Sequence, residues 1–338
     1  MKAINLLRGL VLTGGIVAAR KLVRDNRYSN FYDKVVLITG GSRGLGLVMA
    51  RQLTDEGAKL ALVARNEEEL ERAKRELDNR GGEVLIVPGD VTDPEQVHEI
   101  VAKVRDHYGA VDVLINNAGV IQVGPMETMT RHEYEEALKT HFWAPYHVTM
   151  AVVPMMRARR WGRIVNVASV GGVVGLPHMM PYSASKHALV GFSDSLRAEL
   201  MPHGILVTTA CPGLVRTGSP RNVTVKGQHE EEYAWFKIAD SLPGLSMSAE
   251  STAQAILNAA RFGEASVITT IPAKIMSGLR GLFPGLTSDL MSVTNRLLPG
   301  PGHRGGTIAK KGWQSESKLS QSFLTKATQT AARTNNEM

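Results

Sequence analysis

The sequence predicts an α/β protein built on a doubly wound parallel sheet. Short apolar runs rich in β-branched residues alternate with longer, charge-bearing segments of helical character. These runs are apolar almost throughout, which is typical of parallel strands covered by helices on both faces. We therefore expect a Rossmann-type sheet of about seven strands, with ligands bound at the carboxyl ends where the strand order reverses. The runs are KVVLIT (34–39), KLALVA (59–64), EVLIVP (83–88), VDVLIN (111–116), RIVNVA (163–168) and ILVTTA (205–210).

The chain is expected to form one folded domain with extensions at both ends. Its 338 residues, 43% of them hydrophobic, are enough for one large core. The strand pattern places this domain at 33–263. We place an apolar, basic helix at 1–32, an amphipathic helical extension at 264–298, and a Gly/Pro linker with a polar tail at 299–338. The Ser/Thr/Gln-rich composition of that tail is typical of weak order.

Residues 9–19 form an apolar run between Arg8 and a basic cluster at 20–24. The run is too short to span a bilayer, which takes about 20 residues. The basic cluster that follows it disfavours a signal peptide. Two interpretations stay open: a helix packed on its own protein, and a helix lying on a membrane surface.

The net charge of +7 is carried by the two ends of the chain. Residues 1–34 hold seven Lys/Arg against two acids, and residues 299–338 hold six against two. A nucleic-acid binder more often carries its basic face on the folded module, so we expect no nucleic-acid partner and favour an anionic membrane surface. The single cysteine, Cys211, excludes an intramolecular disulfide and indicates a reducing compartment. We predict a cytoplasmic protein, with peripheral contact to the cytoplasmic face of a membrane as an open alternative.

The helical extension carries an apolar stripe with Pro284 in its middle. Spacings of three and four residues predict two amphipathic helices that break before Pro284. The first interpretation is a cover on the core or a dimer face, and the alternative is a membrane-facing or substrate-entry element. The stripe consists of Ile271, Ile275, Leu279, Leu282, Leu286, Leu290, Val293 and Leu297.

A glycine-rich turn, TGGSRGLG (39–46), follows the first predicted strand. Gly40, Gly44 and Gly46 lie between a strand and a helix. There, missing side chains let the backbone approach a pyrophosphate at the helix N-terminus. The turn therefore indicates a nucleotide site.

Three ordered motifs resemble those of the short-chain dehydrogenase/reductase family: TGxxxGxG at the turn, NNAG at 116–119 and YSASK at 182–186. The resemblance extends from residue 33 to about residue 263. It implies a nicotinamide-dependent enzyme that interconverts a small ketone or aldehyde and its alcohol, without a metal. It also implies a homo-oligomer, a dimer or tetramer, paired through 131–159 and 181–201. The matching cofactor contacts are Gly40, Ser42, Arg43, Leu45, Gly46, Asp90, Val91, Asn117, Ala118, Gly119, Tyr182, Lys186, Pro212, Gly213, Val215 and Thr217.

The second predicted strand ends in LVAR, which bears on the choice of cofactor. Ala64 and Arg65 stand where NAD-specific sites place an acid for the ribose 2′-hydroxyl. Arg43 and Arg65 can together clamp a 2′-phosphate through charge-assisted, planar contacts. We predict NADP(H), with two solvated loop arginines as the alternative.

Tyr182 and Lys186 lie one helical turn apart, and Ser169 ends the fifth predicted strand. A free tyrosine has a pKa of about 10, so it needs a neighbouring cation to carry protons at neutral pH. Lys186 offers that cation on the same helix face. The resemblance implies that Tyr182 is the general acid for reduction and the base for oxidation. It also implies that Ser169 orients the substrate oxygen, while Lys186 lowers the tyrosine pKa and holds the nicotinamide ribose.

One position departs from the family pattern. The family has an Asn thirteen residues before the Pro near the end of its fourth long helix, and counting back from Pro154 reaches His141. Histidine titrates near neutrality and both donates and accepts hydrogen bonds. We predict that His141 replaces the Asn in a proton relay, and packing alone is the alternative.

The substrate side is expected to be apolar. Met179, Met180, Trp235 and Phe236 suggest an adaptable apolar pocket, and His178 is expected to be an exposed loop residue. We predict an NADP(H)-dependent oxidoreductase acting on an apolar carbonyl or alcohol. The alternative is a dinucleotide-binding scaffold or redox sensor without turnover, at a membrane surface or elsewhere.

Overall fold

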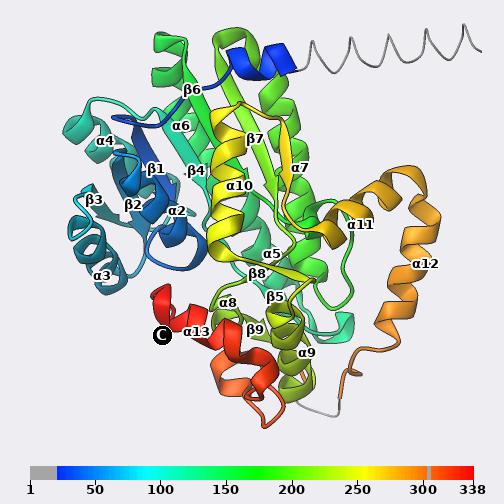
Figure 1. Cartoon of the computed structure of the whole chain (residues 1–338). Coiled ribbons are helices and arrows are strands. Elements are labelled where there is room, and N and C mark those ends of the chain that lie inside the picture. Colours follow the sequence, from blue (N-terminus) through cyan, green and yellow to red (C-terminus); the bar gives the residue numbers. More distant parts are fainter. Residues whose placement is uncertain (1–20, 303–305) are drawn as a thin grey trace, which may run out of the picture.

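The computed structural model describes residues 21–302 and 306–338 and confirms the doubly wound sheet (Figure 1). Seven parallel strands lie in the order β11-β7-β6-β4-β1-β2-β3. The order reverses between β1 and β4, and the carboxyl ends of these two strands are where such sheets bind ligands. The strands are β1 (Val35–Thr39), β2 (Lys59–Ala64), β3 (Glu83–Pro88), β4 (Val113–Asn116), β6 (Gly162–Val167), β7 (Ile205–Cys211) and β11 (Ser266–Ile268).

Helices cover both faces of the sheet, because alternate residues of each strand point to opposite sides. In β1, Val36 and Ile38 pack into one core, and Leu37 packs into the other. The first core is covered by α2 (Gly44–Asp55), α3 (Glu67–Asp78) and α10 (Ala249–Arg261), and the second by α4 (Pro94–Tyr108), α6 (Ala144–Arg159) and α7 (Met180–Leu200). This two-sided burial explains why the strands are apolar throughout.

The turn between β1 and α2 leaves no room for side chains at two of its glycines. A Cβ atom on Gly46 would lie 2.1 Å from the carbonyl oxygen of Gly40, and one on Gly40 would lie 2.9 Å from the Cα of Ala118. Gly40 and Gly44 also have φ angles of +65° and +56°, which side-chain-bearing residues rarely adopt. Backbone geometry therefore requires glycine here.

A π-helical turn, Lys139–Trp143, joins α5 (Arg131–Leu138) to α6. Such turns insert one extra residue into a helix and often occur at functional sites. Here the turn places His141 in the interior, where its side chain is buried.

The sheet continues past the predicted boundary at 263, because β11 forms its edge. The next two helices, α11 (Ile271–Leu282) and α12 (Pro284–Asn295), confirm the predicted break before Pro284. They project from the body of the protein (Figure 1), and most of their apolar stripe is exposed. Ile271 and Leu282, for example, are 73% and 76% exposed. The expected cover on the core of the same chain is therefore wrong, and a dimer or membrane contact stays a prediction.

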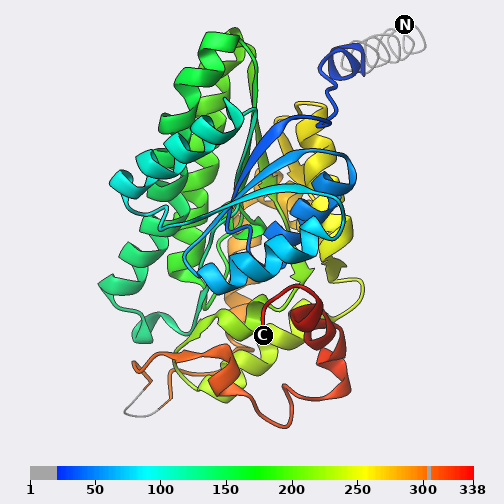
Figure 2. The same cartoon turned by 90° about the vertical axis from the view of Figure 1, so that its left-hand side faces the viewer.

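A smaller layer lies beyond the carboxyl ends of the strands (Figure 2). It contains β8 (Leu214–Arg216) paired with β10 (Ser246–Ser248), a sheet of β5 (Gln122–Val123), β9 (Thr224–Val225) and β12 (Lys310–Lys311), and the helices α8 (Ser219–Asn222), α9 (His229–Ser241) and α13 (Lys326–Thr334).

The tail expected to be weakly ordered packs into this layer instead. Helix α13 buries Thr328 and Ala332, and the Thr328 hydroxyl hydrogen-bonds to the Ser241 hydroxyl on α9. The small side chains of α13 allow this close approach, so a polar composition does not prevent packing here.

Most of the predicted N-terminal helix, residues 1–20, lies outside the described residues. Within the part of the chain that the structure describes, none of the helices has the length and apolar character needed to cross a membrane.

Candidate active site

A cavity of about 600 Å³ opens at the carboxyl ends of β1, β4, β6 and β7. It brings together residues that the sequence places more than 170 positions apart, from Gly40 in the first turn to Thr217 after β7. Every predicted site residue lines it except Gly46, which packs beneath the turn against the Gly40 carbonyl. The lining residues are Gly40, Ser42, Arg43, Leu45, Arg65, Asp90, Val91, Asn117, Ala118, Gly119, His141, Ser169, Tyr182, Lys186, Pro212, Gly213, Val215 and Thr217.

The side chain of Asn117 fixes the glycine turn. Its Nδ2 donates to the carbonyl oxygens of Thr39 (3.2 Å) and Gly40 (3.0 Å). Thr39 Oγ1 in turn accepts from the backbone N–H groups of Asn117 (3.0 Å) and Ala118 (3.2 Å). These bonds tie the end of β1 to the end of β4 and hold the turn at the edge of the cavity.

Ser42 and Arg43 share a carboxylate that was not among the predicted site residues. Ser42 Oγ donates to Glu69 Oε2 (3.0 Å), and Arg43 Nη1 pairs with Glu69 Oε1 (2.9 Å). Glu69 lies in the first turn of α3, and its N–H donates to the N-cap side chain of Asn66 (3.0 Å). Arg65 lines the same cavity. The sequence signal for Glu69 is the acidic first turn of α3. This turn follows the end of β2, where NAD-specific sites place an acid.

Ser169, Tyr182 and Lys186 line the cavity from the end of β6 and the start of α7. Ser169 Oγ accepts from the N–H of Gly171 (3.1 Å), so its own proton remains for another acceptor. Lys186 Nζ donates to the carbonyl oxygen of Val167 (2.8 Å) and lies 5.8 Å from the ring centroid of Tyr182.

Burial is the largest influence on the pKa values of Tyr182 and Lys186. It raises the pKa of Tyr182 to about 12, an effect opposed by a hydrogen bond with Ser169. It lowers the pKa of Lys186 to about 7, opposed by the neighbouring Cys211. Tyr182 therefore holds its proton at neutral pH, and the lowering of its pKa by Lys186 stays a prediction.

His141 has both ring nitrogens engaged. Nε2 accepts from the backbone N–H of Val120 (3.1 Å), so the ring proton belongs on Nδ1, which lies 2.7 Å from Ser185 Oγ. Ser185 Oγ in turn donates to the carbonyl oxygen of Tyr182 (2.9 Å). Burial lowers the pKa of His141 well below its usual value, and the charge of Lys186 adds to this. The expectation that His141 titrates near neutrality is therefore wrong, since desolvation disfavours the charged ring.

Two of the four residues expected to form an apolar substrate pocket line the cavity. Met179 and Phe236 line the cavity. Met180 is largely exposed and lies outside the lining, as does Trp235, whose ring N–H donates to Glu232 (2.8 Å).

His178, expected to be an exposed loop residue, is buried. Its Nδ1 lies 2.8 Å from Glu232 Oε1, a buried carboxylate on α9. This contact explains the difference, because a loop histidine with a buried hydrogen-bond partner loses little by leaving solvent.

Two further acids line the cavity. Burial raises the pKa of Asp240, on α9, well above its usual value, and raises that of Glu337, in the tail, to about 7. Nothing near the glycine turn in the sequence indicated Glu337, because residue 337 is brought there only by the tertiary fold.

Comparisons with known proteins agree with this geometry. A family model described as "short chain dehydrogenase" matches residues 34–226. The chain is 34% identical to a dehydrogenase/reductase SDR family protein 7-like of Anopheles gambiae, over 82% of this chain and 87% of the relative. It is 37% identical to the ketoacyl reductase HetN of Nostoc sp., over 54% and 63%.

The solved structure of levodione reductase superposes with a TM-score of 0.62 at 29% identity, covering 71% of this chain and 96% of that one. The sequence family, the relatives and the fold all agree. The chain therefore belongs to the short-chain dehydrogenase/reductase family, whose members are oxidoreductases that use nicotinamide dinucleotides and act on CH–OH groups.

Proposed function

We propose that this protein is an NADP(H)-dependent oxidoreductase that reduces an apolar ketone or aldehyde, or oxidises the matching alcohol. The observation that carries the proposal is the meeting of the glycine turn with Ser169, Tyr182 and Lys186 around one cavity. A scaffold without turnover would need the turn but not the three polar side chains.

The glycine turn suits a dinucleotide. Close packing at Gly40 and Gly46 brings the start of α2 to the edge of the cavity, and this helix start carries a partial positive charge that favours a pyrophosphate. Arg43 and Arg65 border the cavity and would hold a 2′-phosphate. Glu69 competes for Arg43, so the strength of the NADP preference depends on this ion pair.

Each polar side chain has a distinct role in the proposed reduction. A reduced nicotinamide, when bound in this cavity, would supply the hydride for the new C–H bond. Tyr182 Oη donates its proton to the carbonyl oxygen, and Ser169 Oγ donates a hydrogen bond to the same oxygen as it gains charge. Lys186 stabilises the resulting phenolate until a proton returns. Oxidation of the alcohol reverses these steps.

The lining favours an apolar substrate. Beside Tyr182 the cavity is bordered by Ile121, Leu176, Met179, Val223 and Phe236. The ketoacyl reductase and levodione reductase among the similar proteins support carbonyl reduction as the chemistry.

We assign His141 a positioning role. Its Nδ1–H holds the Ser185 hydroxyl, which binds the backbone of Tyr182, and its ring meets the Tyr182 ring edge-on at 5.4 Å. His141 thus fixes the first turn of α7, and a role in the proton relay stays a prediction.

Replacing Tyr182→Phe should remove the proton donor and keep the ring. We expect carbonyl reduction to fall by about 100-fold or more, with NADPH affinity changed little. The assay follows NADPH oxidation with aliphatic, steroid-like, quinone and acyl-chain ketones, with and without detergent, and Tyr146→Phe on α6 serves as control. Unchanged turnover in the Tyr182 variant would overturn the proposed chemistry. NADPH binding with no ketone reduced by the parent would favour the scaffold.

The double variant Arg43→Ala/Arg65→Ala should weaken NADPH far more than NADH. Each lost charge-assisted contact is worth about 1.5–3 kcal/mol, roughly tenfold or more in affinity. The companion Glu69→Gln should tighten NADPH alone, because it releases Arg43 and Ser42. Fluorescence titration with both nucleotides measures these effects. Equal losses for NADPH and NADH would contradict the assignment.

His141 should make the protein less stable in acid. The unfolded histidine takes up a proton below its ordinary pKa of about 6.5, whereas the buried one does not, so stability falls as pH drops below that value. Between pH 7.5 and about 5.5 the parent should lose about 1.4 kcal/mol more in total than His141→Asn, measured by denaturant unfolding. Parallel curves would disprove a neutral buried His141, and matching pH–rate profiles of the two proteins would remove the relay.

We also propose a homo-oligomer that pairs through α5, α6 and α7. Trp143 and Met150, which are 48% and 41% exposed, support this proposal. Sedimentation should show a dimer or tetramer that Met150→Asp weakens. A monomeric parent would contradict the proposal.

We propose in addition a peripheral membrane contact, which the exposed apolar stripe on α11 and α12 supports. Flotation with anionic vesicles should recover the parent and less of the Leu286→Asp variant. Equal flotation of the two proteins would contradict the membrane contact.

A further inference from the structure

Residues 335–337 of the tail lie directly against the glycine turn. The carbonyl oxygen of Asn335 accepts from the N–H of Gly44 (2.9 Å). Asn336 Nδ2 donates to the carbonyl oxygens of Ser42 (2.8 Å) and Glu69 (3.0 Å). Figures 1 and 2 show the end of the tail beside α2 and α3. The tail thus uses backbone groups of the same turn that is predicted to hold the cofactor.

The Glu337 side chain also lies against the glycine turn. Its carboxylate is buried and accepts from the N–H of Gly218, in the segment after β7 that links β8 to α8. Its Oε1 lies 3.2 Å from the position that a Cβ atom on Gly44 would take. The carboxylate therefore lies between the glycine turn and the loop after β7, the two segments expected to contact a dinucleotide.

An anion in this place has a physical cause. The start of α2 favours negative charge, and Arg43 lies near enough to lower the pKa of Glu337. Burial outweighs these effects and raises that pKa to about 7, with the Glu69 carboxylate adding to the rise. Glu337 is therefore held where a phosphate group would be stabilised, at the cost of its own solvation.

We propose that residues 335–337 are a built-in competitor of the dinucleotide: the Glu337 carboxylate takes the anion position at the glycine turn and must leave before the pyrophosphate binds. The inference rests on the proposed function, because it needs a dinucleotide to compete with. Asn335 and Glu337 fill the space beside Gly44, and Glu337 in its ionised form also repels a phosphate, so the tail and the pyrophosphate exclude one another. The apparent affinity for the cofactor is then lowered by the fraction of molecules in which the tail is docked.

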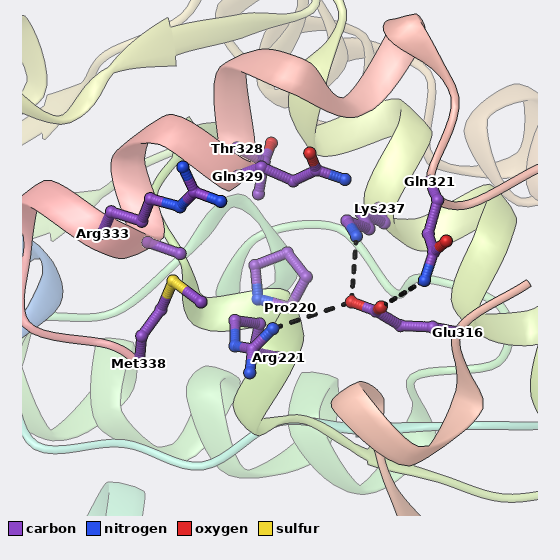
Figure 3. A pocket seen from close by; sticks show the side chains of 10 residues that line it. Pro220, Arg221, Lys237, Glu316, Gln321, Thr328, Gln329, Arg333 and Met338 are labelled. Atoms are coloured by element: carbon purple, nitrogen blue, oxygen red, sulfur yellow. Dashed lines mark hydrogen bonds and ion pairs between the residues drawn. The ribbon is translucent and has the colours of Figure 1, made fainter.

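The tail can leave with only the end of α13 opening, where the N–H groups of Asn335 and Glu337 donate to the carbonyl oxygens of Ala331 and Ala332. A second pocket, of about 300 Å³, lies between α13 and α9 (Figure 3) and is lined by Arg333 and Met338. Met338 is 62% exposed. Helix α13 is instead held by its buried Thr328 and Ala332. Residues 335–337 are thus held to the turn mainly by polar contacts that water can replace.

The experiment compares the parent with a protein lacking residues 335–338 and with Glu337→Gln, using Glu99→Gln on α4 as the matched control. NADPH dissociation constants come from fluorescence titration. We expect the truncation to tighten NADPH by about tenfold or more, and Glu337→Gln to tighten it by a smaller factor, with the control unchanged. In the parent, NADPH and inorganic pyrophosphate should each speed hydrogen exchange of the backbone amides at 335–337.

Opposite results are readily distinguished. Weaker NADPH binding after truncation would show that the tail holds the cofactor in place, and unchanged binding with unchanged exchange would show that the two do not compete; either overturns the inference and leaves the proposed function standing. If no variant binds NADPH or NADH, the proposed function fails and the competition fails with it. Should the truncated chain not fold, Glu337→Gln and the exchange measurement decide the question.

Discussion

The close approach of Gly46 to the Gly40 carbonyl is the contact on which the rest of the site depends. It sets the angle at which α2 leaves β1, and the bonds from Asn117 then tie this turn to the end of β4. Because β1 and β4 flank the point where the strand order reverses, one backbone constraint aligns the turn with the strand ends that border the cavity. A methyl group at Gly46 would separate the elements that the cavity joins.

Desolvation is the second organising effect. The same burial raises the pKa of Tyr182, lowers that of Lys186 and keeps His141 neutral. Tyr182 keeps its proton at neutral pH, and its proposed role as proton donor needs a nearby positive charge, such as that of Lys186, to bring its pKa closer to neutrality. Because the pKa of Lys186 is about 7, its charge depends on what binds nearby. An anion bound beside it would raise this pKa and favour the ammonium form.

The fold and most of the cavity could be predicted because their signals are local. Continuous apolar runs mark strands buried on both faces, and TGxxxGxG, NNAG and YSASK mark turns and helix starts at the carboxyl ends of those strands. What could not be predicted depends on contacts between distant segments. Glu69 is not among the predicted site residues, because it stands one helical turn beyond the strand end where NAD-specific sites place an acid. His178 was expected in solvent because its partner Glu232 lies 54 residues away.

The bond between Asn336 and the carbonyl oxygen of Ser42 joins residues 294 positions apart, which bears on the order in which the molecule forms and opens. Forming this contact in an unfolded chain would close a very long loop, which costs conformational entropy. The cost falls once the sheet between the two residues has folded. The docked tail therefore depends on the sheet, whereas the sheet, with its own two cores, does not depend on the tail. In local unfolding the tail should be among the earliest parts to open, so that the glycine turn is uncovered by a small fluctuation and not by loss of the fold.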